Sequence, residues 1–207
     1  MTAVLRACLT HQGRRFELYE PSPADVDLHA ATLAGWYNEP ANVAMMEGSG
    51  VMDEADVAAF WQELRAAGGR GFFARVDGAL VGDLDLRSVR GRTAELAIMI
   101  GERQRQGRGV GRVLAATLLV VAFRELGLEK VYAPSRRDNA RMRAMAASLG
   151  FVDDESDEAR ALLDSDACTT QSVTASSFRA LHADAWSAVR VDSASAPPLT
   201  GSSPRAT

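Results

Sequence analysis

A short glycine-rich segment, residues 106–111 (Gln-Gly-Arg-Gly-Val-Gly), restricts what this chain can fold into more than any other feature of the sequence. It follows an apolar run that ends at Ile100 and precedes a long apolar segment that begins at Val110. Glycines allow the backbone to approach a ligand closely, and the amino terminus of a helix presents N–H groups without partners and a partial positive charge. The segment therefore predicts a strand-to-helix turn that binds a pyrophosphate.

The spacing of the glycines distinguishes this loop from two common nucleotide-binding loops. A Walker loop ends in Gly-Lys-Ser or Gly-Lys-Thr, whereas Gly111 is followed here by Arg112 and Val113. A dinucleotide fingerprint requires GxGxxG, whereas the third glycine of this chain comes one position early. Both comparisons argue against a nucleotide-binding protein, which would bind ATP or NAD more tightly than coenzyme A.

The hydrophobic pattern around the loop predicts an α/β fold. The pair Asp77-Gly78 separates two apolar runs and favours a two-residue hairpin turn, and a third run completes an antiparallel meander. A strand, helix, strand, helix series follows the meander. The expected strands cover residues 16–19, 72–76, 79–89, 93–100 and 130–133, and the expected helices cover residues 24–36, 53–67, 110–126 and 139–149.

The length and composition suit one globular domain. The chain has 207 residues, of which 47% are hydrophobic and 24% charged, so a single core of ordinary size is expected over residues 16–192. Residues 1–15 show no clear period and are expected to be an N-terminal extension. Residues 167–191 are expected to add two strands. Residues 193–207 contain three prolines and are expected to form a disordered tail.

Charge and cysteine usage exclude several classes of protein. A formal net charge of -4 argues against nucleic-acid binding and suits a cationic acceptor that carries an amine. The longest strongly apolar run, residues 113–123, is too short to span a membrane, and no secretion signal is evident, so a cytoplasmic location is expected. Cys8, Cys168 and the scattered histidines have no metal-ligand spacing, so no metal is expected.

With these surroundings, the loop resembles the pyrophosphate loop of the GNAT N-acetyltransferases, which reads Gln/Arg-x-x-Gly-x-Gly/Ala. Gln106, Gly109 and Gly111 match its three fixed positions, and residues 149–151 (Leu-Gly-Phe) follow in the order that the family uses. The resemblance covers roughly residues 16–155. It implies a mixed, splayed β-sheet flanked by helices, with acetyl-CoA in the splay.

Residues 36–40 (Trp-Tyr-Asn-Glu-Pro), followed by a helix that starts near Asp53, resemble the branch that contains the ribosomal-protein N-terminal acetyltransferases. That branch also contains polyamine and amino-sugar acetyltransferases, so it does not identify the acceptor. The acceptor is therefore an amine-bearing small molecule or a protein amino group, and a homodimer is left open.

The resemblance also assigns a set of cofactor-binding residues. They are the strand before the loop, whose main chain would bind the pantetheine arm, the loop with the start of its helix, and one later asparagine. Without the resemblance, the sequence of this strand is equally consistent with an ordinary buried strand, and the asparagine is expected to be a helix N-cap. The cofactor-binding residues are Ile98, Met99, Ile100, Gln106, Gly107, Arg108, Gly109, Val110, Gly111, Arg112 and Asn139.

Glu95 is the candidate catalytic residue. It is the one ionised side chain on a weakly polar strand face, where a carboxylate can take the proton of an acceptor ammonium and leave a nucleophilic amine. The alternative is a strand-end carboxylate paired with Arg92. Asp83 and Asp85, which alternate on the preceding strand, are weaker candidates for the same role.

Two departures from the family pattern concern the leaving group. Many members place a tyrosine four residues before the glycine of the Gly-Phe pair, where it protonates the thiolate, but here the position is Ala146, and Met142 replaces a common serine. Tyr132 is a possible substitute or an ordinary strand tyrosine. Because no cysteine lies near the motifs, the expected function is direct acetyl transfer from acetyl-CoA to a primary amine in a ternary complex. The alternative is a non-catalytic regulatory module that binds acyl-CoA.

Overall fold

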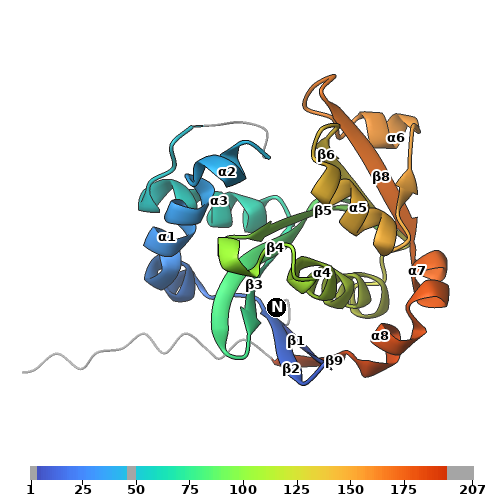
Figure 1. The fold of residues 1–207 in the computed structure, drawn as a ribbon, viewed down its shortest axis with the longest axis horizontal. Coiled ribbons are helices and arrows are strands. Elements are labelled where there is room, and N and C mark those ends of the chain that lie inside the picture. The colour runs from blue at the N-terminus through green and yellow to red at the C-terminus, as the bar shows by residue number, and fades with distance from the viewer. Residues whose placement is uncertain (1–3, 46–49, 195–207) are drawn as a thin grey trace, which may run out of the picture.

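The structure is a computed structural model that describes residues 4–45 and 50–194. Within these residues the strands form one nine-stranded sheet (Figure 1). The strands are β1 (Val4–His11), β2 (Arg14–Tyr19), β3 (Arg70–Val76), β4 (Ala79–Arg90), β5 (Thr93–Ile100), β6 (Lys130–Arg136), β7 (Val152–Asp153), β8 (Cys168–Thr174) and β9 (Arg190–Ala194). Their order across the sheet is β7-β8-β6-β5-β4-β3-β2-β1-β9, and β5 and β6 form its parallel pair.

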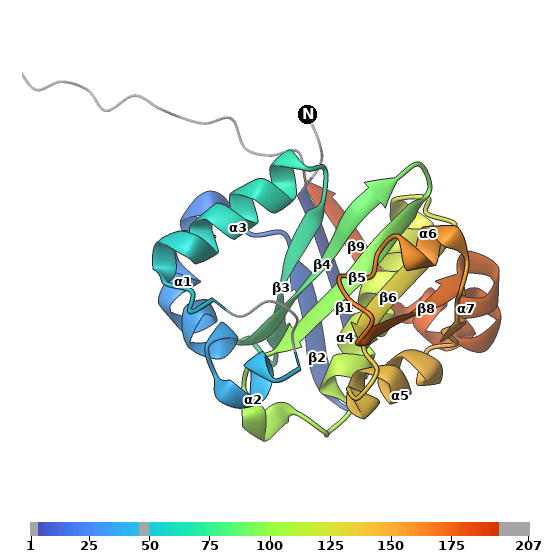
Figure 2. The ribbon, with the colours of Figure 1, turned by 90° about the horizontal axis from the view of Figure 1, so that it is seen from above.

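Helices cover both faces of this sheet. Seen from above, α1 and α3 lie on one side, and α4 and α5 lie on the other (Figure 2). The helical segments are α1 (Pro23–Tyr37), α2 (Pro40–Val43), α3 (Glu54–Ala66), the 3₁₀ turn η1 (Arg103–Arg105), α4 (Val110–Val120), its π-helical continuation η2 (Val121–Glu125), α5 (Ala140–Ser148), α6 (Asp157–Arg160), α7 (Ala175–Leu181) and α8 (Ala183–Ala188). In the described part of the chain, no helix combines the length and apolarity needed to cross a membrane.

The two long helices of the first layer begin at capping boxes that the sequence encodes. Ser22 caps α1 together with Asp25, and Asp53 caps α3 together with Asp56, so that in each case the side chains and the backbone N–H groups bond reciprocally. The apolar sides of these helices bury Leu33 and other residues against the sheet in a separate hydrophobic cluster. The larger core lies on the α4 side of the sheet.

The sheet opens at the parallel pair. The pairing of β5 with β6 begins at Thr93 and ends at Glu95, which lies opposite Tyr132. Beyond this point β5 stays paired with β4 as far as Ile100, while β6 continues only with β8. One backbone edge of residues 96–100 therefore has no strand partner within the described chain. The mixed, splayed sheet expected from the sequence is confirmed.

The prediction that residues 1–15 form an extension is wrong. Residues 4–11 are strand β1, which pairs antiparallel with both β2 and β9 inside the sheet, and β2 already begins at Arg14. Leu5, Ala7 and Leu9 alternate inward and are buried. The alternation is hard to read in the sequence because one of the inward residues is only an alanine.

The carboxyl-terminal third differs in part from the expectation. Residues 167–191 contain β8 and the first residues of β9, but the helices α7 and α8 lie between the two strands. The predicted disordered tail, residues 193–207, begins within the last two residues of β9, and its remainder lies outside the described residues. The hairpin turn at Asp77-Gly78, between β3 and β4, is confirmed.

Replacing Leu5 by alanine tests whether β1 belongs to the core. Leu5 is 6% exposed, so the substitution should cost about 2–5 kcal/mol and lower the melting temperature by roughly 5–15 °C. Thr10→Ala, at an exposed position of the same strand, is the control and should melt like the parent protein. Equal melting of both variants in a thermal unfolding experiment would contradict the placement of β1.

Candidate active site

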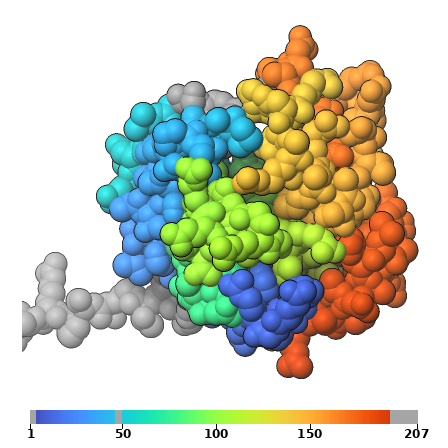
Figure 3. Space-filling view, viewed as in Figure 1, coloured from blue at the N-terminus to red at the C-terminus, as the bar shows by residue number. Residues whose placement is uncertain are grey.

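A cavity of about 950 Å³ lies where β5 and β6 separate. Its wall combines the open half of β5, the glycine loop, the start of α5, the end of β6, and side chains from α1, α2 and α3. Figure 3 shows a hollow between α2, in blue, and α5, in yellow. Because the cavity is bounded by both layers of helices, a bound molecule would contact the loop at one end and the face of β4 and β5 at the other.

The glycine loop presents backbone donors to this cavity. Gly109 is the N-cap of α4 and has the left-handed conformation, with φ 78°, and no side chain caps the helix. The first N–H to bond within the helix is that of Val113, which donates to the carbonyl of Gly109. The N–H groups of Val110, Gly111 and Arg112 are therefore available to an anion, as the sequence predicts.

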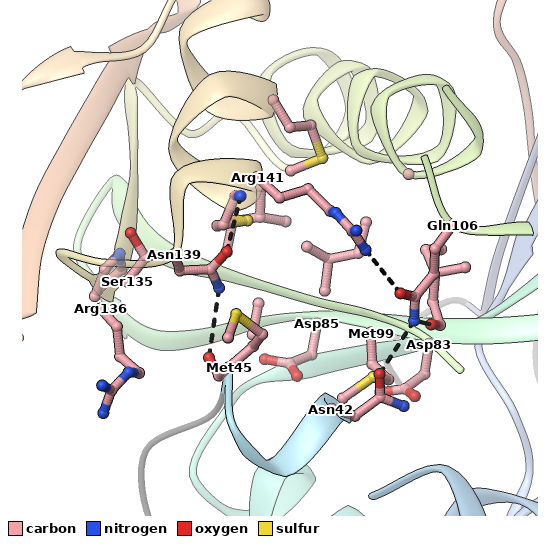
Figure 4. A pocket seen from close by; sticks show the side chains of 18 of the residues that line it. Asn42, Met45, Asp83, Asp85, Met99, Gln106, Ser135, Arg136, Asn139 and Arg141 are labelled. Carbon is pink, nitrogen blue, oxygen red and sulfur yellow. Dashed lines mark hydrogen bonds between the residues drawn. The ribbon is translucent and has the colours of Figure 1, made fainter. Parts of the chain in front are cut away.

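The side chain of Gln106 connects three parts of the site (Figure 4). Its Nε2 donates to the carbonyl of Ile100 at 2.6 Å and to Oδ1 of Asn42 at 3.1 Å, and its Oε1 accepts from Nη1 of Arg141 at 2.8 Å. The amide thus fixes the end of β5 against α2 and α5. This role was not predicted, because only the fold brings Asn42 and Arg141 to the loop.

Asn139 is the N-cap of α5, as the residue-level interpretation predicts. Its Oδ1 accepts from the N–H of Met142 at 3.0 Å, and its Nδ2 donates to the carbonyl of Met45 at 3.4 Å. Asn139 also lines the cavity, so a cofactor contact stays a prediction.

The other predicted cofactor residues divide into two groups. Ile98, Met99 and Ile100 line the cavity, as do Gly107, Gly109, Gly111 and Arg112. Val110 is buried in the core, and Arg108 is exposed outside the cavity lining, so these two residues can contribute main-chain groups of the loop but do not form the cavity wall.

Three carboxylates lie on the same face of β4 and β5, toward α1 and α3. Asp83, Asp85 and Glu95 all line the cavity. In the register of the two strands, Asp83 lies opposite Met99, and Glu95 lies opposite Arg87. Arg87 donates two hydrogen bonds to Asp85, at 2.6 and 2.5 Å, so the charge of Asp85 is balanced by the guanidinium.

Glu95 is half-buried at the point where the sheet opens. Burial raises the pKa of its carboxyl group, while the charge of Arg87 and a hydrogen bond from Ser88 lower it. The Ser88 hydroxyl donates to Oε2 of Glu95 at 3.2 Å. Arg92 pairs with Glu129 instead, so the alternative pairing considered for Glu95 is not observed. Glu95 therefore lies where a catalytic carboxylate was predicted, and its role stays a prediction.

Asp83 is more deeply buried than its position in the sequence suggests. The residue is 5% exposed, and its Oδ1 has no hydrogen-bond partner. Burial and the neighbouring Asp85 raise the pKa of Asp83 to about 7, against opposing contributions from the Tyr37 hydroxyl and Arg87. The Tyr37 hydroxyl is itself buried without a partner in hydrogen-bonding geometry, and burial raises its pKa well above the usual value.

The wall formed by β6 and β8 contributes residues that the sequence reading missed. Ser135, on β6, has a buried hydroxyl without a hydrogen-bond partner and lines the cavity. Cys168 also lines it, because antiparallel pairing places Cys168 opposite Arg136. The expectation that no cysteine lies near the motifs is therefore wrong for the folded chain, because Cys168 lies in the wall of the same cavity.

Neither position considered for a thiolate-protonating tyrosine reaches the cavity. Ala146 is buried in the core, and Tyr132 is buried beside Lys130, whose Nζ lies 4.8 Å from the ring centroid. The cavity wall contains Met142 and Met145 instead. Among the described residues, no group of three or more histidine, cysteine or carboxylate side chains is arranged to hold a metal ion.

Comparisons with known proteins agree with this geometry. The family model described as "Acetyltransferase (GNAT) domain" matches residues 15–152. No curated protein matches the chain.

Solved structures of similar fold include Mycobacterium smegmatis RimJ in complex with CoA-disulfide, at 20% identity and a TM-score of 0.69, covering 89% of this chain and 95% of that chain. A chimera of spermidine N-acetyltransferase SpeG from Vibrio cholerae and hSSAT is 20% identical, with a TM-score of 0.63 and coverage of 79% and 97%. Ribosomal-protein-S5-alanine acetyltransferase from Vibrio fischeri is 12% identical, with a TM-score of 0.62 and coverage of 81% and 96%. At identities of 12–20%, these similarities show that the chain shares the fold of these proteins.

Replacing Gly109 by valine tests the anion-binding loop. A β-branched residue at this positive φ costs about 1–2 kcal/mol of backbone strain and places a side chain where a diphosphate would approach. We expect coenzyme A to bind ~10-fold more weakly or worse in a calorimetric titration. Gly13→Val is the matched control, because Gly13 has a similar φ of +73° in the remote β1–β2 turn. Equal affinity in both folded variants would contradict the assignment.

The pH dependence of stability tests the environment of Asp83. Its pKa is raised from 3.8 to about 7 on folding, so the folded state holds the proton more tightly, and stability falls as the pH rises through this window. The loss reaches on the order of 4 kcal/mol above pH 7. Asp83→Asn should remove it, so that the variant gains stability relative to the parent between pH 4 and pH 7 in urea unfolding. Asp27→Asn, at an exposed position on α1, should show no such gain.

Proposed function

The chain belongs to the GNAT acetyltransferase family, and from this premise we propose that it transfers the acetyl group of acetyl-CoA to a primary amine by direct attack in a ternary complex. The observation that carries the proposal is the shape of the cavity. One end of the cavity combines an open strand edge with a helix amino terminus, and these features suit coenzyme A. The other end is lined by carboxylates, which suit an amine.

The cofactor end is formed mainly by backbone. The open edge of residues 96–100 can pair with the amide groups of the pantetheine arm as a neighbouring strand would. The diphosphate then meets the free N–H groups at the start of α4, with Arg103 and Arg112 in the surrounding wall. The predicted contacts of Asn139 and of the loop residues belong to this part of the proposal.

The acceptor end supplies the proton chemistry. An ammonium ion must lose a proton before its nitrogen can attack the thioester carbonyl, and we assign this proton to Glu95. The raised pKa of Glu95 makes the carboxylate a better proton acceptor. Attack of the neutral amine forms the C–N bond and a tetrahedral oxyanion, which N–H groups of the open β5 edge can stabilise. Collapse of this intermediate breaks the C–S bond, the nitrogen releases its second proton to solvent, and the departing thiolate takes a proton from solvent.

Cys168 makes a second route testable, because a cysteine in the cavity wall can in principle carry the acetyl group before the amine attacks. Direct attack requires both substrates to be bound together, so initial-rate plots should intersect and Cys168→Ser should retain turnover. Parallel plots together with an inactive serine variant would support the covalent route. The non-catalytic module, which the missing tyrosine favours, predicts coenzyme A binding without turnover of any amine.

The named relatives include acetyltransferases for spermidine and for a ribosomal protein. We therefore propose a small-molecule amine or a protein amino group as the acceptor, and a cytoplasmic location for the reaction.

Glu95→Gln tests the proposed base. The substitution keeps the shape of the side chain but removes its ability to accept a proton, so kcat should fall ~10²-fold or more while the affinity for coenzyme A is kept. The acidic limb of the pH profile should change in the same variant. Glu63→Gln, at an exposed position on α3, is the control. A variant with parental kcat and KM would remove Glu95 from the mechanism.

A further inference from the structure

The acceptor end of the cavity contains more negative charge than one ammonium requires. Arg87 neutralises Asp85, but Asp83 and Glu95 form no ion pair among the described residues. Asp164, from the segment before β8, lines the cavity and adds its negative field at Glu95. Asp83 and Glu95 therefore face the same chamber without an ion pair of their own, because Arg87, whose charge acts on both, is bonded to Asp85.

These two carboxylates are too far apart to share one nitrogen. In the register of the two strands, Asp83 lies opposite Met99 and Glu95 lies opposite Arg87. The two carboxylates are therefore four residues apart along the same face of the sheet. Four residues of a strand span about 13 Å, whereas a hydrogen bond joins atoms about 3 Å apart. The group that contacts Asp83 and the amine that Glu95 deprotonates must therefore be different parts of the acceptor.

The surroundings of Asp83 suit a buried ligand group. Asp83 lies opposite Met99, and Met99 packs in the same hydrophobic cluster as Tyr37, Met52 and Phe60, all of which line the cavity. Asp83 and Tyr37 are 5% and 7% exposed. Oδ1 of Asp83 and the hydroxyl of Tyr37 both lack hydrogen-bond partners. Buried polar groups without partners destabilise a fold, and a ligand that satisfies them removes this cost.

We propose that Asp83, with the Tyr37 hydroxyl, forms a second cation-binding subsite, so that the preferred acceptor is an aliphatic diamine. One amine reacts beside Glu95, the second ammonium group binds at Asp83, and the hydrocarbon chain between them passes Ala97 and Met99 on β5. This inference rests on the proposed acetyltransferase function.

The subsite should make the affinity for diamines depend on pH. The titratable and charged groups facing Asp83 are Tyr37 from α1 and Asp85 and Arg87 on β4. Asp83 is largely neutral at low pH, and a nearby ammonium ion favours its ionised form. The KM for a diamine should therefore fall as the pH rises through 7, while the KM for a monoamine should change less.

The experiment compares amines of matched length with the full-length protein and acetyl-CoA. The probes are butylamine and 1,4-diaminobutane, then hexylamine and 1,6-diaminohexane, at about pH 6 and about pH 8 on either side of the folded pKa. In the parent protein, kcat/KM should favour at least one diamine over its monoamine by roughly 10-fold or more. Asp83→Asn should bring this ratio close to one, with the loss on KM rather than on kcat. Asp27→Asn, an exposed α1 carboxylate, should keep the ratio.

The outcomes separate the inference from the proposed function. Acetylation of monoamines and diamines at equal kcat/KM would overturn the second subsite and leave the acetyltransferase function intact. A diamine preference that survives in Asp83→Asn would also overturn it. If no amine were acetylated, the proposed function would fail, and calorimetric titration of the same amines would still test the subsite through the difference in affinity between the parent and Asp83→Asn.

Discussion

The separation of β5 from β6 after Glu95 is the constraint on which the rest of the site depends. Two parallel strands that stayed paired would use the backbone groups along their facing edges on each other, and the sheet would have no opening. Because the pairing stops after three residues, the edge of residues 96–100 keeps N–H and C=O groups free for a ligand. The glycine loop and α4 begin directly beyond this edge, so the free strand edge and the free helix amino terminus lie next to each other.

The alternation of side chains on β4 and β5 gives the two faces of the same strands different tasks. Leu84, Leu86 and Leu96 point toward α4 and form the large core, whereas Asp83 and Glu95 point toward α1 and α3. A strand at the centre of a sheet is normally apolar on any face that is covered. Here the covered face contains carboxylates, and the hydrophobic cluster of the first layer closes around them only in part.

Several polar groups in the cavity wall are left without partners, among them Asp83, Tyr37 and Ser135. Each destabilises the folded chain by the free energy of desolvation that no hydrogen bond offsets. The Gln106 amide in the same wall, by contrast, forms three hydrogen bonds within the chain. Buried side chains elsewhere in the described chain also lack partners, but those of Asp83, Tyr37 and Ser135 lie in a cavity wall, where a bound molecule can supply the missing partner.

The sequence by itself determined the local features. The Asp77-Gly78 turn, the capping residues of α1, α3 and α5, and the loop that starts α4 follow from interactions between residues a few positions apart, and for this reason they were predictable. Tertiary structure decided what lies opposite each of these elements. It placed β1 inside the sheet, carried Cys168 to the cavity wall, and paired Arg92 with Glu129 rather than with Glu95. It also buried Asp83 and Asp85 in the cavity wall, because their burial depends on helices α1 and α3, which are separate elements in the sequence and cover β4 only after the chain has folded.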